Sequence, residues 1–254
     1  MTAKVLTERR GAVLVITLNR PEARNAIDTE TAWGVSDALD ELDGDSTLVA
    51  GVLTGAGSTF CAGMDLKAFL AGEKPSVGDR GFAGIVERPP AKPVIAAVEG
   101  TAVAGGFEIV LACDLIVAAD NARFGLPEVK RGLVAAGGGL MRLSRRIPFH
   151  LAMEWALTGD FIAAATAARF GLVNRLVPAG SAVDAAVEMA AAIAANGPLA
   201  VAATKRILVE ARDWTSEEEF EKQRQISVPV RESADAREGA LAFKEKRAPR
   251  WAGR

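Results

Sequence analysis

The stretch Glu99-Gly-Thr-Ala-Val-Ala-Gly-Gly-Phe-Glu-Ile-Val-Leu-Ala-Cys-Asp114 decides the fold. The apolar run before it, Lys92–Val98, has a proline near its start and predicts a buried strand. From Ala104 onward the residues are small or apolar and include no proline, which predicts a helix. The order strand, glycine-rich turn, helix indicates an α/β protein.

The predicted start of this helix has features of a chemical site. Gly105 and Gly106 allow a ligand to approach the backbone, and N–H groups in the first turn of a helix have no partner inside it. Such groups bind negative charge. Glu108 follows about one turn further on and can reach the same place. A carboxyl group beside an anion-binding backbone corner indicates acid–base chemistry on a carbonyl compound.

A second turn of small residues, Cys61-Ala62-Gly63, also follows a buried strand. Two backbone N–H groups that converge on one oxygen form an oxyanion hole, and the two turns predict such a pair. Glu128 comes directly after Pro127, where another strand ends. It is too far along the chain from Glu108 for one helix face, but the two carboxyl groups could meet across a helix–strand layer.

Composition excludes several classes of protein. The 254 residues fit one large domain or one and a half, and the net charge of −2 does not favour binding to nucleic acid or an anionic membrane. Cys61 and Cys113 suggest neither a disulfide framework nor a zinc site, and we interpret them as small buried residues. Without a G-x-S-x-G motif, the lone His150 is interpreted as structural. The absence of a signal peptide and of a long apolar run predicts a cytoplasmic protein.

The remaining elements change character along the chain. The first part predicts strands and helices, and the part after Val183 predicts helices only, with a boundary near residues 180–196. In order, we expect a hairpin from Val5–Glu8 and Ala12–Leu18, a helix from Asp28 to about Leu42, a strand at Val49–Thr54, a helix at Leu66–Leu70 capped by Asp65, a mobile loop at Gly72–Arg80, helices at Val183–Ala195 and Leu199–Ala211, a helix with a Ser216/Glu219 capping box, and a helix at Ser233–Lys246.

Seven segments resemble the crotonase family, the enoyl-CoA hydratase/isomerase superfamily, in the family's order and over nearly the whole chain. They are Asn19–Ala26, Phe60–Leu66, Lys92–Gly100, Ala104–Glu108, Asp114–Ala119, Phe124–Glu128 and Gly171–Asn174. The resemblance implies a crotonase-like ββα spiral core over residues 1–195 and a C-terminal all-helical trimerisation region over residues 196–254. It also implies a homotrimer or dimer of trimers, an acyl-CoA thioester substrate, and no metal or other cofactor, since coenzyme A is part of the substrate.

The resemblance also assigns site residues. The oxyanion donors would be the N–H groups of Ala62 and Gly105, and the two catalytic glutamates would be Glu108, which activates water, and Glu128, which protonates Cα. On sequence grounds alone the two glutamate roles are interchangeable. The substrate would further contact residues in the segment Asn19–Ala26, in and after the two turns and near the C-terminus: Arg24, Ala26, Gly63, Met64, Asp65, Leu66, Gly106, Phe243 and Lys246. Arg24 would meet a CoA phosphate, or is a plain surface arginine, and Phe243 and Lys246 would reach CoA from a neighbouring subunit.

We therefore expect an enoyl-CoA hydratase, which adds water reversibly to a trans-2-enoyl-CoA. One alternative is a carnitinyl-CoA dehydratase-like enzyme, because Gly106-Phe107-Glu108 with Leu126-Pro127-Glu128 is also similar to that group. Another is a Δ3,Δ2-enoyl-CoA isomerase, which needs only one glutamate. The third is a non-catalytic acyl-CoA-binding or RNA-binding homologue, whose marks would be lost glutamates or a basic patch. Val134-Ala135 stands where family members often have a proline, in a loop that would line the acyl pocket.

Overall fold

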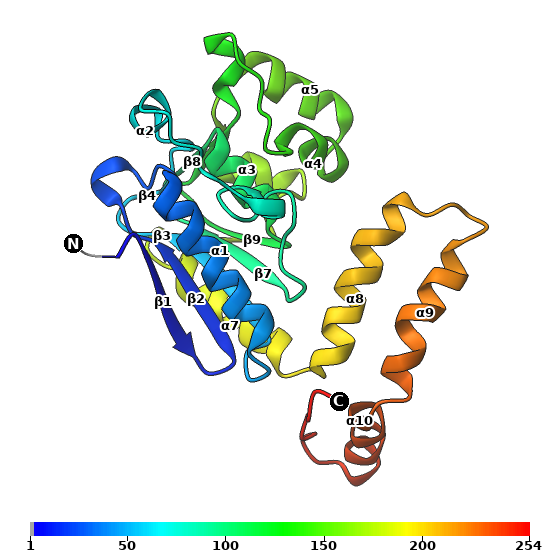
Figure 1. Cartoon of the computed structure of the whole chain (residues 1–254). Helices are drawn as coiled ribbons and strands as arrows, with labels where there is room; N and C mark the ends of the chain where they lie inside the picture. The colour runs from blue at the N-terminus through cyan, green and yellow to red at the C-terminus, as the bar shows by residue number, and fades with distance from the viewer. Residues whose placement is uncertain (1–2) are drawn as a thin grey trace.

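The structure is a computed structural model, which describes residues 3–254 (Figure 1). Its main sheet begins with the antiparallel hairpin β1–β2, which confirms the predicted hairpin, and continues with parallel strands. The strand order is β1 (Val5–Arg10), β2 (Val13–Leu18), β3 (Ala50–Gly55), β7 (Val94–Val98), β9 (Leu115–Ala119) and β12 (Arg175–Val177).

A second, smaller sheet positions the site. Its order is β11 (Ile162–Ala163), β10 (Arg123–Gly125), β8 (Thr101–Val103) and β4 (Thr59–Cys61). Strands β4, β8 and β10 run parallel, so the residues that follow each of them leave the sheet at the same edge. A short hairpin, β5 (Ser76–Val77) with β6 (Gly81–Phe82), lies within and just beyond the segment predicted as a loop, so that prediction was wrong about its structure.

Ten α-helices are present in residues 3–254. They are α1 (Thr29–Gly44), α2 (Leu66–Leu70), α3 (Gly105–Ala112), α4 (Gly139–Arg146), α5 (Phe149–Thr158), α6 (Ala164–Arg169), α7 (Ala182–Ala194), α8 (Pro198–Glu210), α9 (Glu219–Arg231) and α10 (Ala234–Glu245). Short 3-10 helices occupy Pro21–Ala23, Gly78–Arg80, Pro127–Arg131 and Ala211–Asp213. The predicted N-caps are confirmed for α1 and α2, where the side chains of Asp28 and Asp65 accept backbone N–H groups of the first turn.

The main sheet is buried on both faces. On β2, Val13 and Val15 point to one apolar cluster, while Leu14, Ile16 and Leu18 point to the other, as the alternation of a strand requires. The first cluster is completed by α7, whose residues Ala182, Ala186 and Ala190 pack on the sheet. The second cluster contains α1 and α3. Continuous apolar strands such as β7 are typical of a sheet covered on both sides.

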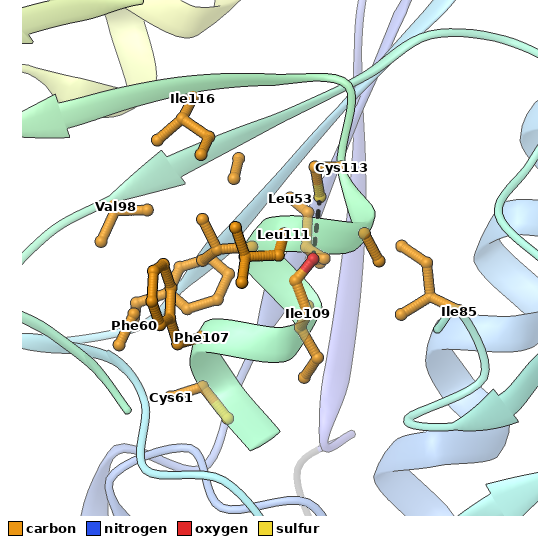
Figure 2. Packing of buried hydrophobic residues seen from close by; sticks show 14 of the residues in the cluster. Leu53, Phe60, Cys61, Ile85, Val98, Phe107, Ile109, Leu111, Cys113 and Ile116 are labelled. Carbon is orange, nitrogen blue, oxygen red and sulfur yellow. Dashed lines mark hydrogen bonds between the residues drawn. The ribbon is translucent and has the colours of Figure 1, made fainter. Parts of the chain in front are cut away.

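Helix α3 is buried along its whole length, and all eight of its residues are inaccessible to solvent or nearly so. Figure 2 shows it surrounded by core side chains, with Phe60 and Phe107 together at one side and Ile85 at the other. The thiol of Cys113 donates to the carbonyl of Ile109. Cys61 and Cys113 are both buried, which confirms their interpretation. A helix buried on all sides is held rigidly, and this rigidity extends to the residues at its start.

The C-terminal helices α8, α9 and α10 extend away from the sheet (Figure 1). Helix α8 is tied to the core by Lys205, whose ammonium donates to the carbonyls of Pro90 and Lys92 and pairs with Asp114 at 2.7 Å. The prediction of a Ser216/Glu219 capping box is wrong. The N–H groups of Glu218 and Glu219 donate to the carbonyl of Thr215, which forms a turn ahead of the helix, and α9 begins at Glu219. The division at residue 195 stays a prediction.

In residues 3–254, no single helix is long and apolar enough to cross a membrane, although α7 and the segment Pro198–Asp213, bent sharply against each other, pass that test as a pair.

Candidate active site

The two small-residue turns lie against each other. Because β4 and β8 pair in parallel, the chain after Cys61 and the chain after Val103 emerge side by side. Gly63 has a positive φ of 92°, and a Cβ added to it would lie 3.0 Å from the backbone nitrogen of Gly105. Gly106 is packed more tightly still, since a Cβ there would lie 2.2 Å from the carbonyl oxygen of Cys61. Glycine is required here because any side chain would force the two backbones apart.

The backbone amides at this contact differ from the predicted pair. The N–H of Ala62 donates to the carbonyl of Arg24 over 3.0 Å, so it is already occupied and the predicted role of Ala62 is wrong. The N–H of Met64, two residues on, has no acceptor within residues 3–254, and neither has that of Gly105 at the start of α3. The pair of available donors is therefore Met64 and Gly105.

The turn that carries Met64 is fixed on both sides. The carbonyl of Gly63 accepts the N–H of Ile27 at 2.8 Å, and the N–H of Asp65 donates to the carbonyl of Ile27 at 2.9 Å. The carboxylate of Asp65 caps α2 through Lys67 and Ala68 and pairs with Arg20 at 3.0 Å. Asp65 is thus a structural cap in this geometry. These bonds orient the Met64 amide before any substrate binds, as an oxyanion donor requires.

Glu108 lies in the first turn of α3 and is only 4% exposed. Its Oε1 accepts the N–H of Gly139 at 3.0 Å. Burial raises the pKa of its carboxyl group above the usual range, while the amides of Gly139 and Gly137 and the charge of Arg142 act in the opposite direction. A carboxyl group with a raised pKa exchanges its proton more readily near neutral pH, which suits a general acid or base.

Glu128 lies in the 3-10 helix that follows β10. Its Oε2 is buried and has no hydrogen-bond partner among residues 3–254. Burial raises the pKa of this carboxyl group, and the negative charge of Glu108 raises it further. This effect of Glu108 on Glu128 indicates that the two side chains, which come from different elements, lie near one site. Two carboxyl groups that interact through their charges can titrate as a pair and hold one proton between them.

Comparison with known proteins agrees with this geometry. The family model described as enoyl-CoA hydratase/isomerase matches residues 8–254. The chain belongs to that family.

Similar proteins include the enoyl-CoA hydratase EchA19 of Mycobacterium tuberculosis, 46% identical over 98% of this chain and 96% of that protein. The carnitinyl-CoA dehydratase of Proteus mirabilis is 44% identical over 96% of this chain and 97% of that protein. Among solved structures, the enoyl-CoA hydratase EchA1 from Mycobacterium marinum has 56% identity and a TM-score of 0.98, with both chains fully covered. The fold is that of the crotonase enzymes, and the chain is a lyase of the hydratase/dehydratase kind whose family acts on acyl-CoA thioesters.

The other residues predicted to contact the substrate fall into two groups. Arg24 and Leu66 are exposed beside the Met64 turn, and the carbonyl of Ala26 accepts the side chain of Arg20. Phe243, which is 88% exposed, and Lys246 belong to α10 and its end. Figure 1 places α10 far from α2 and α3, so one chain does not bring these two residues to the site.

Two features of the site were missed in the sequence. The glycine run 137–139 contacts Glu108 closely, since a Cβ on Gly137 would lie 2.7 Å from its Oε2. The ring of Phe82, from β6, covers Gly105, because a Cβ on Gly105 would lie 2.6 Å from it. Three consecutive glycines ahead of a helix were a signal for the first feature. No local pattern indicated the second, because it depends on where the β5–β6 hairpin folds.

Proposed function

We propose that this protein is an enoyl-CoA hydratase, which adds water reversibly and in the syn sense to a trans-2-enoyl-CoA and gives a 3-hydroxyacyl-CoA. The observation that carries the proposal is the pair of glutamates beside the free N–H of Gly105. Glu108 is 4% exposed, and Glu128 has a buried Oε2 and a pKa that the charge of Glu108 raises.

The proposed reaction uses each group once. The N–H groups of Gly105 and Met64 polarise the thioester carbonyl, which makes Cβ electrophilic and stabilises the enolate-like transition state. Glu108 accepts a proton from water as its oxygen bonds to Cβ, and Glu128 gives a proton to Cα. Only protons are transferred between the reactants and these groups, so the chemistry calls for no redox cofactor or metal.

The two-glutamate site also favours hydration over double-bond isomerisation, because moving a double bond needs only one group to shuttle a proton. Single replacements Glu108→Gln and Glu128→Gln should each lower kcat for hydration of crotonyl-CoA by roughly 10²–10⁴-fold. The assay follows loss of enoyl-thioester absorbance. Near-full turnover in both variants would refute the proposal.

The relatives named carnitinyl-CoA dehydratase make a positively charged acyl group the second candidate. The cations that act on the glutamate pair here are Arg131 and Arg142. Their charge opposes a trimethylammonium group close by, so we favour a neutral acyl chain. The test compares kcat/KM for crotonyl-CoA and for its γ-trimethylammonio analogue, and a higher value for the analogue would reverse this choice.

We further propose a homotrimer or a dimer of trimers. The support is that α8 buries none of its residues in one chain, while Leu208, Phe220 and Phe243 of the C-terminal helices are largely exposed. A second copy would cover this apolar surface and could bring Phe243 and Lys246 to the CoA of its neighbour. Equilibrium sedimentation at micromolar concentration should give a trimer or hexamer, and a monomer would contradict the proposal.

A further inference from the structure

Arg142 is a half-buried cation for which the proposed reaction has no use. It lies at the end of the first turn of α4, and its guanidinium donates to two backbone carbonyls from different segments. Nη1 donates to Gly137 at 3.2 Å, and Nη2 donates to Val86, which follows the β5–β6 hairpin. Its own N–H closes the first turn of α4 on the carbonyl of Gly138 at 3.0 Å. Arg142 therefore joins three pieces of chain around the glycine run 137–139.

That glycine run is the surface on which Glu108 rests. Gly139 donates its N–H to Oε1 of Glu108 at 3.0 Å, and an added Cβ on Gly139 would lie 2.8 Å from Cγ of the same side chain. Three consecutive glycines have more backbone freedom than any other sequence, so nothing in the run itself holds this shape. The restraint comes from outside the run, and Arg142 supplies it at Gly137.

From this geometry, and on the basis of the function proposed above, we infer that Arg142 is a positioning residue: it holds the glycine run that orients Glu108 and places a positive charge beside that carboxyl group.

The charge has a consequence of known sign. The charged group that acts on Glu108 is Arg142, from α4, whereas the charge of Glu108 itself raises the pKa of Glu128, from the 3-10 helix after β10. Burial favours the protonated form of Glu108, whereas Arg142 favours the ionised form that a base needs. Removing the cation while keeping the fold must raise the pKa of Glu108 and move the acid limb of the pH–rate profile to higher pH.

Two substitutions separate the charge from the hydrogen bonds. Arg142→Gln removes both, so kcat should fall by about 10–10²-fold with little change in KM, and the acid limb should move to higher pH. Arg142→Lys keeps the cation but cannot bind two carbonyls with one planar group. It should lower kcat as well, while the acid limb stays near its original position.

Arg146 provides the matched control. It lies one turn further along α4, is also half-buried and also donates to a backbone carbonyl, that of Cys113 at 2.9 Å, but it does not act on Glu108. Arg146→Gln should destabilise the fold to a similar degree and leave the acid limb in place. If Arg142→Gln and Arg146→Gln give the same pH profile and the same kcat per folded molecule, Arg142 is only structural and the inference fails.

A direct titration removes the dependence on turnover. The carboxyl carbon of Glu108 is followed by ¹³C NMR in protein labelled at glutamate, with the signal assigned by its loss in Glu108→Gln. Its pKa should rise in Arg142→Gln and stay close to the wild-type value in Arg142→Lys and Arg146→Gln. An unmoved pKa in Arg142→Gln overturns the inference. If the shift occurs but the wild type hydrates no enoyl-CoA, the proposed function fails and the inference about Arg142 stands.

Discussion

Replacing Gly106 by alanine should separate α3 from β4 and inactivate the enzyme. A Cβ at this position would lie 2.2 Å from the carbonyl oxygen and 2.8 Å from the carbonyl carbon of Cys61. Both are backbone atoms of a strand paired with β8, so they cannot rotate away as a side chain can. A Cβ essentially never approaches within 3.0 Å of a heavy atom outside its own residue and its chain neighbours, so the contact must open by about 0.8 Å.

The shift has separate effects on stability and on rate. Alanine in place of a helical glycine gains about 1 kcal/mol of helix propensity. Overpacking a rigid interior costs about 1–3 kcal/mol, so Gly106→Ala should fold with a net loss of at most about 2 kcal/mol. The catalytic effect is larger, because Gly105 and Glu108 move with α3 relative to Met64. A displacement near 1 Å lowers kcat by about 10²-fold, and KM should change much less.

The assay measures kcat and KM for hydration of crotonyl-CoA together with the urea midpoint of unfolding. The control is Gly44→Ala, at the last residue of α1, where an added Cβ meets nothing within 4 Å. This variant should keep full activity and be slightly more stable than the wild type. A folded Gly106→Ala enzyme with wild-type kcat would refute the argument that contact between the two turns sets the geometry of the donors.

Three further predictions concern stability. Burial raises the pKa of Glu108, so the ionised carboxylate destabilises the native state at pH values above the pKa of glutamate in the unfolded chain. Glu108→Gln should therefore raise the melting temperature at neutral pH. This gain should shrink as the pH falls through the native pKa of Glu108 in the wild type. Burial of Asp28 acts to raise its pKa, but Lys4, Thr31 and Arg20 lower it overall. Asp28→Ala should thus cost about 1–2 kcal/mol at neutral pH in urea unfolding, and the cost should diminish as acid protonates Asp28 in the wild type. Lys205→Met loses hydrogen bonds to two carbonyls and to Asp114. Urea unfolding should show a free energy of unfolding about 1–3 kcal/mol lower than that of the wild type.

Local chemistry made much of the fold predictable. Asp28 and Asp65 are followed by apolar helical patterns, and both cap the helices that begin just after them. The apolar run before Glu99 forms the central strand β7, because a strand covered on both faces needs no polar side chains. The failures occurred where a local pattern competed with a turn. Ser216 and Glu219 had the spacing of a capping box, but backbone bonds to Thr215 close a turn there instead.

The identity of the second oxyanion donor could not be read from the sequence. The small residues of the turn pointed to this place correctly, but which amide faces the site depends on the direction of each peptide plane. Gly63 has a φ of 92°, which L side chains rarely adopt, and the chain bends there between Ala62 and Met64. The Ala62 N–H turns to the carbonyl of Arg24, a partner 38 residues earlier in the sequence, and only the tertiary structure reveals that bond.

The meeting of the two glutamates has a simple origin in strand register. Strands β8 and β10 pair in parallel with Val103 opposite Gly125, an offset of 22 residues. Glu108 and Glu128 are separated by 20 residues, so each follows its own strand by a few positions and leaves the same edge of the small sheet. The chain after β8 enters a helix and the chain after β10 enters a 3-10 turn, and each of these elements carries one glutamate in its first turn. A one-residue slip of β10 would point its alternate side chains to the opposite face. The parallel pairing of two three-residue strands thus determines whether the pair of acids exists at all.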